Sequence, residues 1–490
     1  MNIDSPGTSS PAQPTAPSTA APALLPTPLT WRVAIAAAIV AVAAAAWGTR
    51  DSIGPRGQAI AGVFFFFGIV AAFSSNLRAV NWRTVGWGFG LQLLLAVLVL
   101  KGRVTLGETT YSVKSGIERV GALFRAFIGF SDKGAEFVFG NLAHPEHLMK
   151  VYGTDFLFPF VFKALPPILF VSAFFTLLYH FGIVQWCVRL MARVMVYLMG
   201  TSGAETLSVS ANVFMGQTEA PLIVKAYVPR MTGSELFTLM VSGFAHISGG
   251  MMFVYINYGA DPTAVITTCV MACPCSLYLS KVFFPERDSP ETGGTARTQH
   301  EKSPYVNAVD AVASGTTDGM KLALNVAAML IVFIAFVAMF DALLGVIKPA
   351  LLWLGVAPNA LVGWPDDLSL SRLFAWLFSP AAFLMGVEPR DIDKVASLLG
   401  SKLAINEHFA YLQFRAMRLA NPDFMTARSQ LLTAFALTGF ANFASVGVQI
   451  GGIGAMAPER RHDLARMGGR ALFVGFTATL LNAAIAGALM

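Results

Sequence analysis

The sequence predicts an all-α polytopic membrane protein, arranged as an inverted repeat with two re-entrant helical hairpins. Of its 490 residues, 13% are charged and 55% are hydrophobic, and the mean hydropathy is +0.61. A soluble domain carries about 25% charged residues, so this chain lacks the charge that a water-exposed surface requires. The repeat is predicted by two apolar segments that polar residues interrupt. The composition excludes an ordinary soluble enzyme, a disordered scaffold and a disulfide-rich secreted module.

The charge balance and the cysteines agree with a membrane location. The formal net charge is +6, and basic loop residues of a membrane protein face anionic lipid. We therefore expect a lipid bilayer and no nucleic acid as a partner, and a multi-pass protein of the plasma membrane (the inner membrane in a bacterium). Every cysteine lies in an apolar run, which predicts buried thiols rather than disulfides: Cys187, Cys269, Cys273 and Cys275.

The N-terminal part begins with residues 1–28, which are rich in Pro, Ser, Thr and Ala and are expected to form a disordered tail. Residues 29–104 are predicted to hold three transmembrane helices, one in each charge-free apolar run: 33–47, 57–73 and 85–100. Residues 113–140 then combine an apolar helical stripe with a charged back face. This pattern predicts an amphipathic helix, either in the membrane interface or packed on protein.

The first interrupted segment spans residues 206–227. Its apolar stretches are too short to cross a bilayer alone, and the residues between them are polar or break helices: Asn212, Gly216, Gln217, Thr218, Glu219 and Pro221. A carboxylate at the centre of a bilayer costs about 3 kcal/mol, and irregular backbone exposed to lipid costs several kcal/mol more. A re-entrant hairpin whose tip lines a watery cavity avoids both costs.

The second interrupted segment spans residues 431–456, and its polar tip contains Gly439, Asn442, Ser445 and Gly447. Paired interrupted segments in two halves of a chain point to a transporter site near the membrane midplane. Two Gly-rich spans that pack closely are the alternative.

A third polar site precedes that segment, where Asn406, Glu407 and His408 interrupt an apolar run. Glu407 is predicted to be a functional carboxylate within the membrane. A carboxylate that is solvated at the headgroups is the alternative.

These residues together resemble the concentrative nucleoside transporter family. The sequence GQTEAP at 216–221, the Asn406-Glu407 pair, and GFAN at 439–442 followed by Ser445 match the family in order and spacing. The flanking sequences GTSGAETLSVSANVF and TTDGMKLALNVAAMLI match as well, and the resemblance covers residues 137–490. It implies secondary active import of nucleosides by cation symport, in a homotrimer whose subunits each hold a binding site.

The resemblance also implies roles for single residues. Gln217 and Thr218 would bind the edge of the base, and Glu219 would reach it through water from the tip that begins at Gly216. The sugar hydroxyls would be bound by Glu407, Asn442 and Ser445, with Phe440 packed against the nucleoside. The chemistry agrees, because a nucleoside is neutral, whereas a nucleotide would need Arg or Lys at the tips.

The same resemblance divides the chain into functional regions. It implies an interfacial helix with scaffold helices (105–200), a first hairpin with transport-domain helices (201–285), a hydrophilic loop (286–303), a second interfacial helix near 306–317 with scaffold helices (304–386), and a second hairpin with transport-domain helices (387–490).

One position departs from the family. Sodium-coupled members hold the ion through the counterpart of Asn212, carbonyls near Met215 and Ile247, and a Ser whose position is His246 here. Sodium prefers oxygen ligands, and histidine can carry a proton near neutral pH. We therefore expect coupling to protons, with His246 and the two intramembrane carboxylates as titrating groups. Coupling to sodium through Asn212 and the carbonyls is the alternative, and no organic cofactor or resident metal is expected.

Two other classes of protein have weaker support. Cys273-Pro274-Cys275 in an apolar run could belong to a soft-metal carrier. A metal pump is excluded, since no soluble stretch is long enough to hold a nucleotide-binding domain. Catalysis is not expected, because the sequence has neither a complete zinc helix motif around Glu407-His408 nor a nucleophile elbow.

Overall fold

A computed structural model describes residues 26–106, 109–144, 147, 162, 165–294, 304–357 and 368–490. These residues are almost entirely helical, apart from a short antiparallel pair, β1 (Arg103–Leu106) and β2 (Thr109–Ser112). Within the described ranges, seven helices are long and apolar enough to cross a membrane, or eight if a bent pair counts as one span. The chain is therefore an integral, multi-pass, helical membrane protein, as predicted.

The N-terminal helices occupy the predicted runs: α1 (Leu29–Gly48), α2 (Arg50–Ala72) and α3 (Trp82–Lys101). Residues 1–25 of the predicted tail lie outside the described residues. The end of that tail is packed, because the Thr27 hydroxyl donates to the carbonyl of Ser74 at 3.1 Å. The helices α2 and α3 pack against α20 (Arg461–Leu489) and α12 (Pro262–Phe283), respectively.

The predicted amphipathic helix is α4 (Val113–Phe139), and it packs on α7 (Leu165–His180), α11 (Gly249–Asn257) and α12. Its Phe127 ring lies 4.7 Å from that of Phe170 and 5.7 Å from that of Phe253. These contacts fit the alternative of a helix packed on protein, and a place in the membrane interface stays a prediction. The helix α8 (Ile183–Met199) follows α7 at a bend of 72°.

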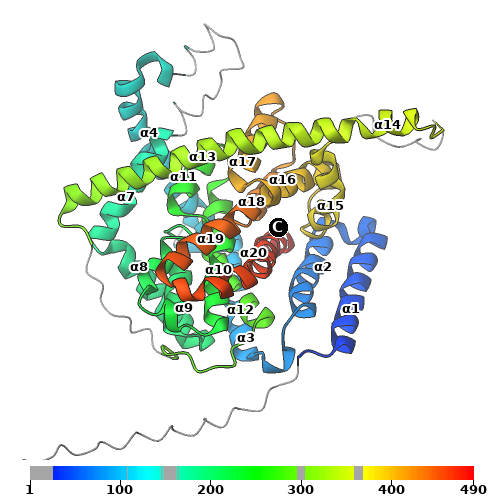
Figure 1. Cartoon of the computed structure of the whole chain (residues 1–490), viewed down its shortest axis with the longest axis horizontal. Helices are drawn as coiled ribbons and strands as arrows, with labels where there is room; N and C mark the ends of the chain where they lie inside the picture. The colour runs from blue at the N-terminus through cyan, green and yellow to red at the C-terminus, as the bar shows by residue number, and fades with distance from the viewer. Residues whose placement is uncertain are drawn as a thin grey trace, which may run out of the picture.

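The first half of the core comprises α9 (Gly203–Ala211), the short 3-10 helices η4 (Ala220–Val224) and η5 (Val228–Arg230), α10 (Gly233–Ala245), α11 (Gly249–Asn257) and α12. After α13 (Ala308–Gly345), α14 (Ile347–Trp353) and α15 (Leu370–Leu384), the second half comprises α16 (Ile392–Ala404), α17 (Glu407–Ala420), α18 (Ala427–Leu437), α19 (Phe443–Met456) and α20. Figure 1 shows α10, α18, α19 and α20 gathered at the centre, with the long α13 crossing one side of the molecule.

The two halves repeat one pattern of helix ends. In the first half, Thr232 caps α10 and Ser248 caps α11, each accepting a backbone N–H with its side chain. In the second half, Thr426 caps α18 and Asn442 caps α19 in the same way. The separation in sequence between the two caps is the same in both halves. In addition, α10 packs on α12 as α18 packs on α20, so the pair α10–α11 corresponds to the pair α18–α19.

The second fold-back of the chain differs in place from the prediction. Residues 431–456 were expected to form a hairpin, but α18 and α19 make almost no contact with each other across their break. The fold-back lies earlier, where α16 and α17 pack together on either side of Ile405 and Asn406. The first fold-back is where it was predicted, since α9 packs on η4. Residues 306–317, expected as a separate helix, run into the continuous α13.

Candidate functional site

The turn between α9 and η4 is held by its own backbone and one carboxylate. Glu219 accepts the Gly216 N–H with Oε2 at 3.0 Å, and the Glu219 N–H donates to the Gly216 carbonyl at 3.0 Å. Gly249, at the start of α11, donates its N–H to the Phe214 carbonyl at 3.0 Å. This bond attaches the turn to the break between α10 and α11, so part of the irregular backbone predicted at 206–227 is satisfied within the protein.

Glu407, at the start of α17, is 4% exposed, and its carboxylate accepts two side-chain hydrogen bonds. The Tyr255 hydroxyl of α11 donates to its Oε1 at 2.9 Å, and the Asn442 amide donates to its Oε2 at 3.0 Å. Asn406 precedes it as the cap of α17 and accepts the Phe409 N–H at 2.8 Å. A buried carboxylate needs such donors, and here they come from both halves of the core.

The break between α18 and α19 is joined to the first break through the backbone. The Phe440 N–H donates to the His246 carbonyl at 3.0 Å, and Asn442 caps α19 by accepting the Ser445 N–H at 2.8 Å. Gly439 has φ +153°, and a Cβ there would lie 2.7 Å from the Thr479 methyl and 3.0 Å from the Phe244 carbonyl oxygen. Only glycine lets the two breaks approach this closely.

Gln217 connects the first turn to α19. Its Nε2 donates to Ser445 Oγ at 3.1 Å, and its Oε1 accepts from Gln449 Nε2 at 3.1 Å. Gly243 of α10 makes room for this pair, because a Cβ on it would lie 2.6 Å from the Gln449 amide nitrogen. Thr218 packs on α19 at Gly452.

Four of the eight predicted nucleoside residues thus form one network of hydrogen bonds. Gln217 and Ser445 are bonded to each other, and Glu407 is bonded to Asn442. Glu219, by contrast, is exposed to a cavity of about 520 Å³ between the first turn and the helices α7 and α13, which Ser248 and Asp318 also line. Phe440 is half-buried at the second break.

The predicted cation residues lie where the end of α9 meets the end of α10. The Asn212 Nδ2 donates to Ser242 Oγ at 2.8 Å, while its Oδ1, on a side chain that is 1% exposed, has no hydrogen-bond partner within the described residues. A buried amide oxygen without a donor suits a hard cation. Met215 lies in the adjoining turn and Ile247 in the break, where irregular backbone leaves carbonyls outside helical bonding.

His246 uses both ring nitrogens within the protein. Its Nδ1 lies 2.9 Å from the Ser242 carbonyl oxygen, and because a carbonyl only accepts, Nδ1 carries a hydrogen. Its Nε2 lies 3.4 Å from the Cys273 sulfur of α12, within reach of the thiol hydrogen. The ring therefore packs as a structural bridge between α10 and α12. The three thiols of α12 are free and buried, and the described part of the chain holds no group of three His, Cys, Asp or Glu side chains placed for a metal.

Sequence reasoning missed three residues of the site. Tyr255, which donates to Glu407, lies in a continuous apolar run and gives no signal of its own. Gln449, which bonds Gln217, is a lone amide in an apolar run and could have been noticed. Asp318 lies in the TTDGMKL sequence of α13, just before the apolar part of that helix. A carboxylate at this place could have been predicted to belong to the site.

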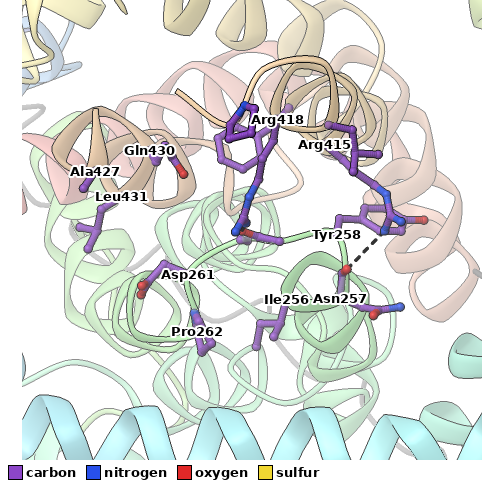
Figure 2. A pocket seen from close by; sticks show the side chains of 15 residues that line it. Ile256, Asn257, Tyr258, Asp261, Pro262, Arg415, Arg418, Ala427, Gln430 and Leu431 are labelled. Carbon is purple, nitrogen blue, oxygen red and sulfur yellow. Dashed lines mark hydrogen bonds between the residues drawn. The ribbon is translucent and has the colours of Figure 1, made fainter. Parts of the chain in front are cut away.

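A larger cavity of about 900 Å³ lies away from these tips, between the α11–α12 loop and the helices α17 and α18. Figure 2 shows Arg415 and Arg418 reaching from α17 toward this loop. Arg418 donates to the Gly259 carbonyl at 2.7 Å and Arg415 to the Asn257 carbonyl at 3.4 Å. None of the predicted site residues lines this cavity, and the arginines fasten the loop.

Broken helices whose ends gather polar groups inside a helical membrane protein are the architecture of a secondary transporter. Comparison with known proteins gives the family. Three family profiles match: "Na+ dependent nucleoside transporter C-terminus" at 264–487, "Na+ dependent nucleoside transporter N-terminus" at 61–142, and "Nucleoside recognition" (Gate) at 161–261. The chain belongs to the concentrative nucleoside transporter family.

Individual relatives agree. The chain is 37% identical to "Sodium/nucleoside cotransporter 1" of Mus musculus and of Homo sapiens over 88% of its length and 63% of theirs, so it spans less than two thirds of these relatives. It is 36% identical to an "Uncharacterized transporter" of Haemophilus influenzae, over 88% of this chain and 97% of that one. The solved structure of CNTnw in an inward-facing substrate-bound state is similar, with TM-score 0.77 and 33% identity over 88% of this chain and 97% of that chain.

Proposed function

We propose that this protein is a sodium-coupled nucleoside symporter that imports nucleosides across the plasma membrane. The single observation that carries the nucleoside site is the network that joins Gln217 to Ser445 and Glu407 to Asn442 at the meeting point of the breaks. These groups are amides, a hydroxyl and a carboxylate, which can exchange their mutual hydrogen bonds for bonds to a base and a sugar. The similar mouse and human proteins are named sodium/nucleoside cotransporters.

In this proposal Gln217 and Thr218 bind the base, and Glu407, Asn442 and Ser445 bind the ribose. Glu219 faces the cavity beside the tip and acts through water, while Phe440 packs on the nucleoside and Gly216 forms the turn. The two fold-backs enter the membrane as re-entrant hairpins, and a homotrimer of such subunits supplies the scaffold. The mostly exposed face of α13 is available for contacts between subunits.

We propose sodium as the coupling ion, in place of the proton that the sequence favoured. The matching profiles are described as Na+ dependent, and the buried Asn212 oxygen without a donor is an oxygen ligand of the kind that sodium prefers. His246, which suggested a proton, is engaged by Ser242 and Cys273. We propose that the ion lies between Asn212 and the carbonyls of Met215 and Ile247, with His246 outside its ligand shell.

Uptake into vesicles that contain the purified protein tests this function. Accumulation of radiolabelled uridine or adenosine under an inward sodium gradient, at equal pH on both sides, is the expected result. Accumulation that follows a proton gradient and ignores sodium would restore the proton reading. No gradient-driven accumulation of any nucleoside would overturn the function itself.

A further inference from the structure

Lys402 of α16 is a lysine in the interior of the core, with no exposed surface. Its ammonium donates to the Ala436 carbonyl at 2.7 Å and to Thr479 Oγ1 at 3.0 Å. It also lies 5.2 Å from the centre of the Phe476 ring. Burying an ammonium is expensive unless its surroundings repay the lost hydration, so a lysine kept at this place needs a physical reason.

The end of a helix explains why a lysine is buried here. Ala436 lies in the last turn of α18, which ends at Leu437 just before the break. The final carbonyls of a helix are unsatisfied and form the negative end of its dipole. An ammonium placed there satisfies the Ala436 carbonyl and neutralises the helix end. Lys402 lies where such a cation would stabilise the end of α18.

The equivalent place in the first half is the end of α10. Ser242 stands four residues before His246 of the first break, as Ala436 stands four residues before Phe440 of the second. In the first half the Ser242 carbonyl accepts from the ring Nδ1 of His246, a side chain of the break itself. In the second half the Ala436 carbonyl accepts from Lys402, which comes from a different helix, α16. The end of α10 is thus satisfied locally, whereas the end of α18 depends on Lys402.

We propose that the Lys402 ammonium neutralises the end of α18 and thereby holds the second break in place for the nucleoside. This inference rests on the proposed nucleoside site, because Asn442 and Ser445 follow directly after that helix end. Lys402 is therefore a positioning residue for transport, whereas the equivalent carbonyl in the first half is bonded by His246 and needs no such cation.

Two substitutions of Lys402 distinguish the loss of its charge from the loss of its volume. Lys402→Ala removes the ammonium and leaves room for a small cation, whereas Lys402→Met removes the charge and fills most of the room. We expect each to lower sodium-driven uridine uptake by about 10- to 100-fold, the effect of losing hydrogen bonds from a charged donor. Methylammonium, which has N–H donors, should restore uptake by Lys402→Ala several-fold and leave Lys402→Met unchanged. Tetramethylammonium, which has the charge but no donor, should restore neither.

Lys394→Met is the matched control. Lys394 lies on the same helix and its ammonium also donates to a backbone carbonyl, that of Phe424, but its side chain is 44% exposed. Uptake by this variant should equal that of the wild type. If Lys402→Met transports at the wild-type rate with wild-type sodium dependence, the proposal is overturned.

A stability measurement decides the case if Lys402→Ala is inactive in every salt. The unfolding temperature of the purified full-length variant should rise in methylammonium chloride above its value in tetramethylammonium chloride at equal ionic strength. Equal temperatures in both salts overturn the proposal. The unfolding temperature is measured without a nucleoside. If the wild-type protein fails to transport nucleosides, the proposed function is wrong, but the effect of methylammonium on the stability of Lys402→Ala can still be measured.

Discussion

The Asn442 amide donates to the Glu407 carboxylate at 3.0 Å, which joins the break of α18 and α19 to the turn between α16 and α17. Both side chains are almost fully buried. Each also holds local structure, since Asn442 caps α19 and Glu407 begins α17. A ligand that inserts here can replace this bond with bonds to its own hydroxyls, without unfolding either helix.

Removing the second donor to Glu407 should weaken nucleoside binding. Tyr255→Phe deletes the hydroxyl 2.9 Å from Glu407 and keeps the ring stacked on Tyr411 at 4.3 Å. We expect the KM for nucleoside uptake to rise by about tenfold, the effect of losing one hydrogen bond to a charged group. Tyr278→Phe is the control, because its buried hydroxyl donates to Gln92, away from Glu407. An unchanged KM in Tyr255→Phe would show that Glu407 does not depend on this donor.

The amide of Gln217 should set recognition of the base. Gln217→Ala removes its bonds to Ser445 and Gln449, so we expect the KM to rise about tenfold and discrimination among nucleosides to fall. Competition between uridine and adenosine for uptake measures both effects. Gln430→Ala is the control, since this amide donates to the Met425 carbonyl in the α17–α18 loop. A Gln217→Ala variant that keeps the wild-type order of nucleosides would contradict the assignment.

The identity of the coupling ion can be tested by replacing His246 of the first break with serine, which has an oxygen. His246→Ser gives up the contacts with Ser242 and Cys273 and places a hydroxyl at the break, next in sequence to Ile247. Because sodium prefers oxygen ligands, the sodium concentration for half-maximal uptake should fall. Cys273→Ser, which leaves a donor opposite the ring, should leave that concentration unchanged. A His246→Ser protein that loses all cation coupling would argue that the histidine itself carries the coupled proton.

A buried ion pair should govern stability at the other end of α12. Lys281 lies 2.8 Å from Glu205 and 3.2 Å from Glu286, and its side chain is 7% exposed. Lys281→Met leaves the Glu205 carboxylate buried without its partner, which destabilises proteins by about 3–5 kcal/mol. We expect a clear fall in the unfolding temperature of the detergent-purified protein. Adding Glu205→Gln to Lys281→Met should recover part of the loss, and a further fall instead would contradict the pairing.

The sequence was sufficient to predict elements whose pattern lies within a single helix or a single turn. Charge-free runs predicted α1, α2 and α3, and the polar tip GQTEAP predicted the first fold-back. The second fold-back was placed at 431–456 because a Gly and Asn break looks alike whether the chain turns back or continues. The direction depends on packing: α16 and α17 lie against each other, while α18 and α19 do not. Glu407 was predicted to be functional, but neither Asn406 nor Glu407 was predicted to lie at the tip of this fold-back.

Long-range partners were out of reach for the same reason. Tyr255 and Glu407 are 152 residues apart in sequence, and Lys402 and Thr479 are 77 apart. No periodicity links such pairs, because the contact depends on how the two halves of the core meet. His246 suggested a proton carrier from residue type alone, and only its contacts with Ser242 and Cys273 revealed a structural use for both ring nitrogens.

Nucleoside uptake by Asn442→Ala tests the central claim most directly. The variant loses the donor to Glu407 and the cap of α19, and loss of such a cap costs about 1 kcal/mol, which the fold should tolerate. Asn307→Ala removes the equivalent cap from α13, at an exposed site outside the network. We predict sodium-driven uptake at background level in Asn442→Ala and at wild-type level in Asn307→Ala, with both proteins inserted in similar amounts. Wild-type uptake of uridine and adenosine by Asn442→Ala would contradict the account.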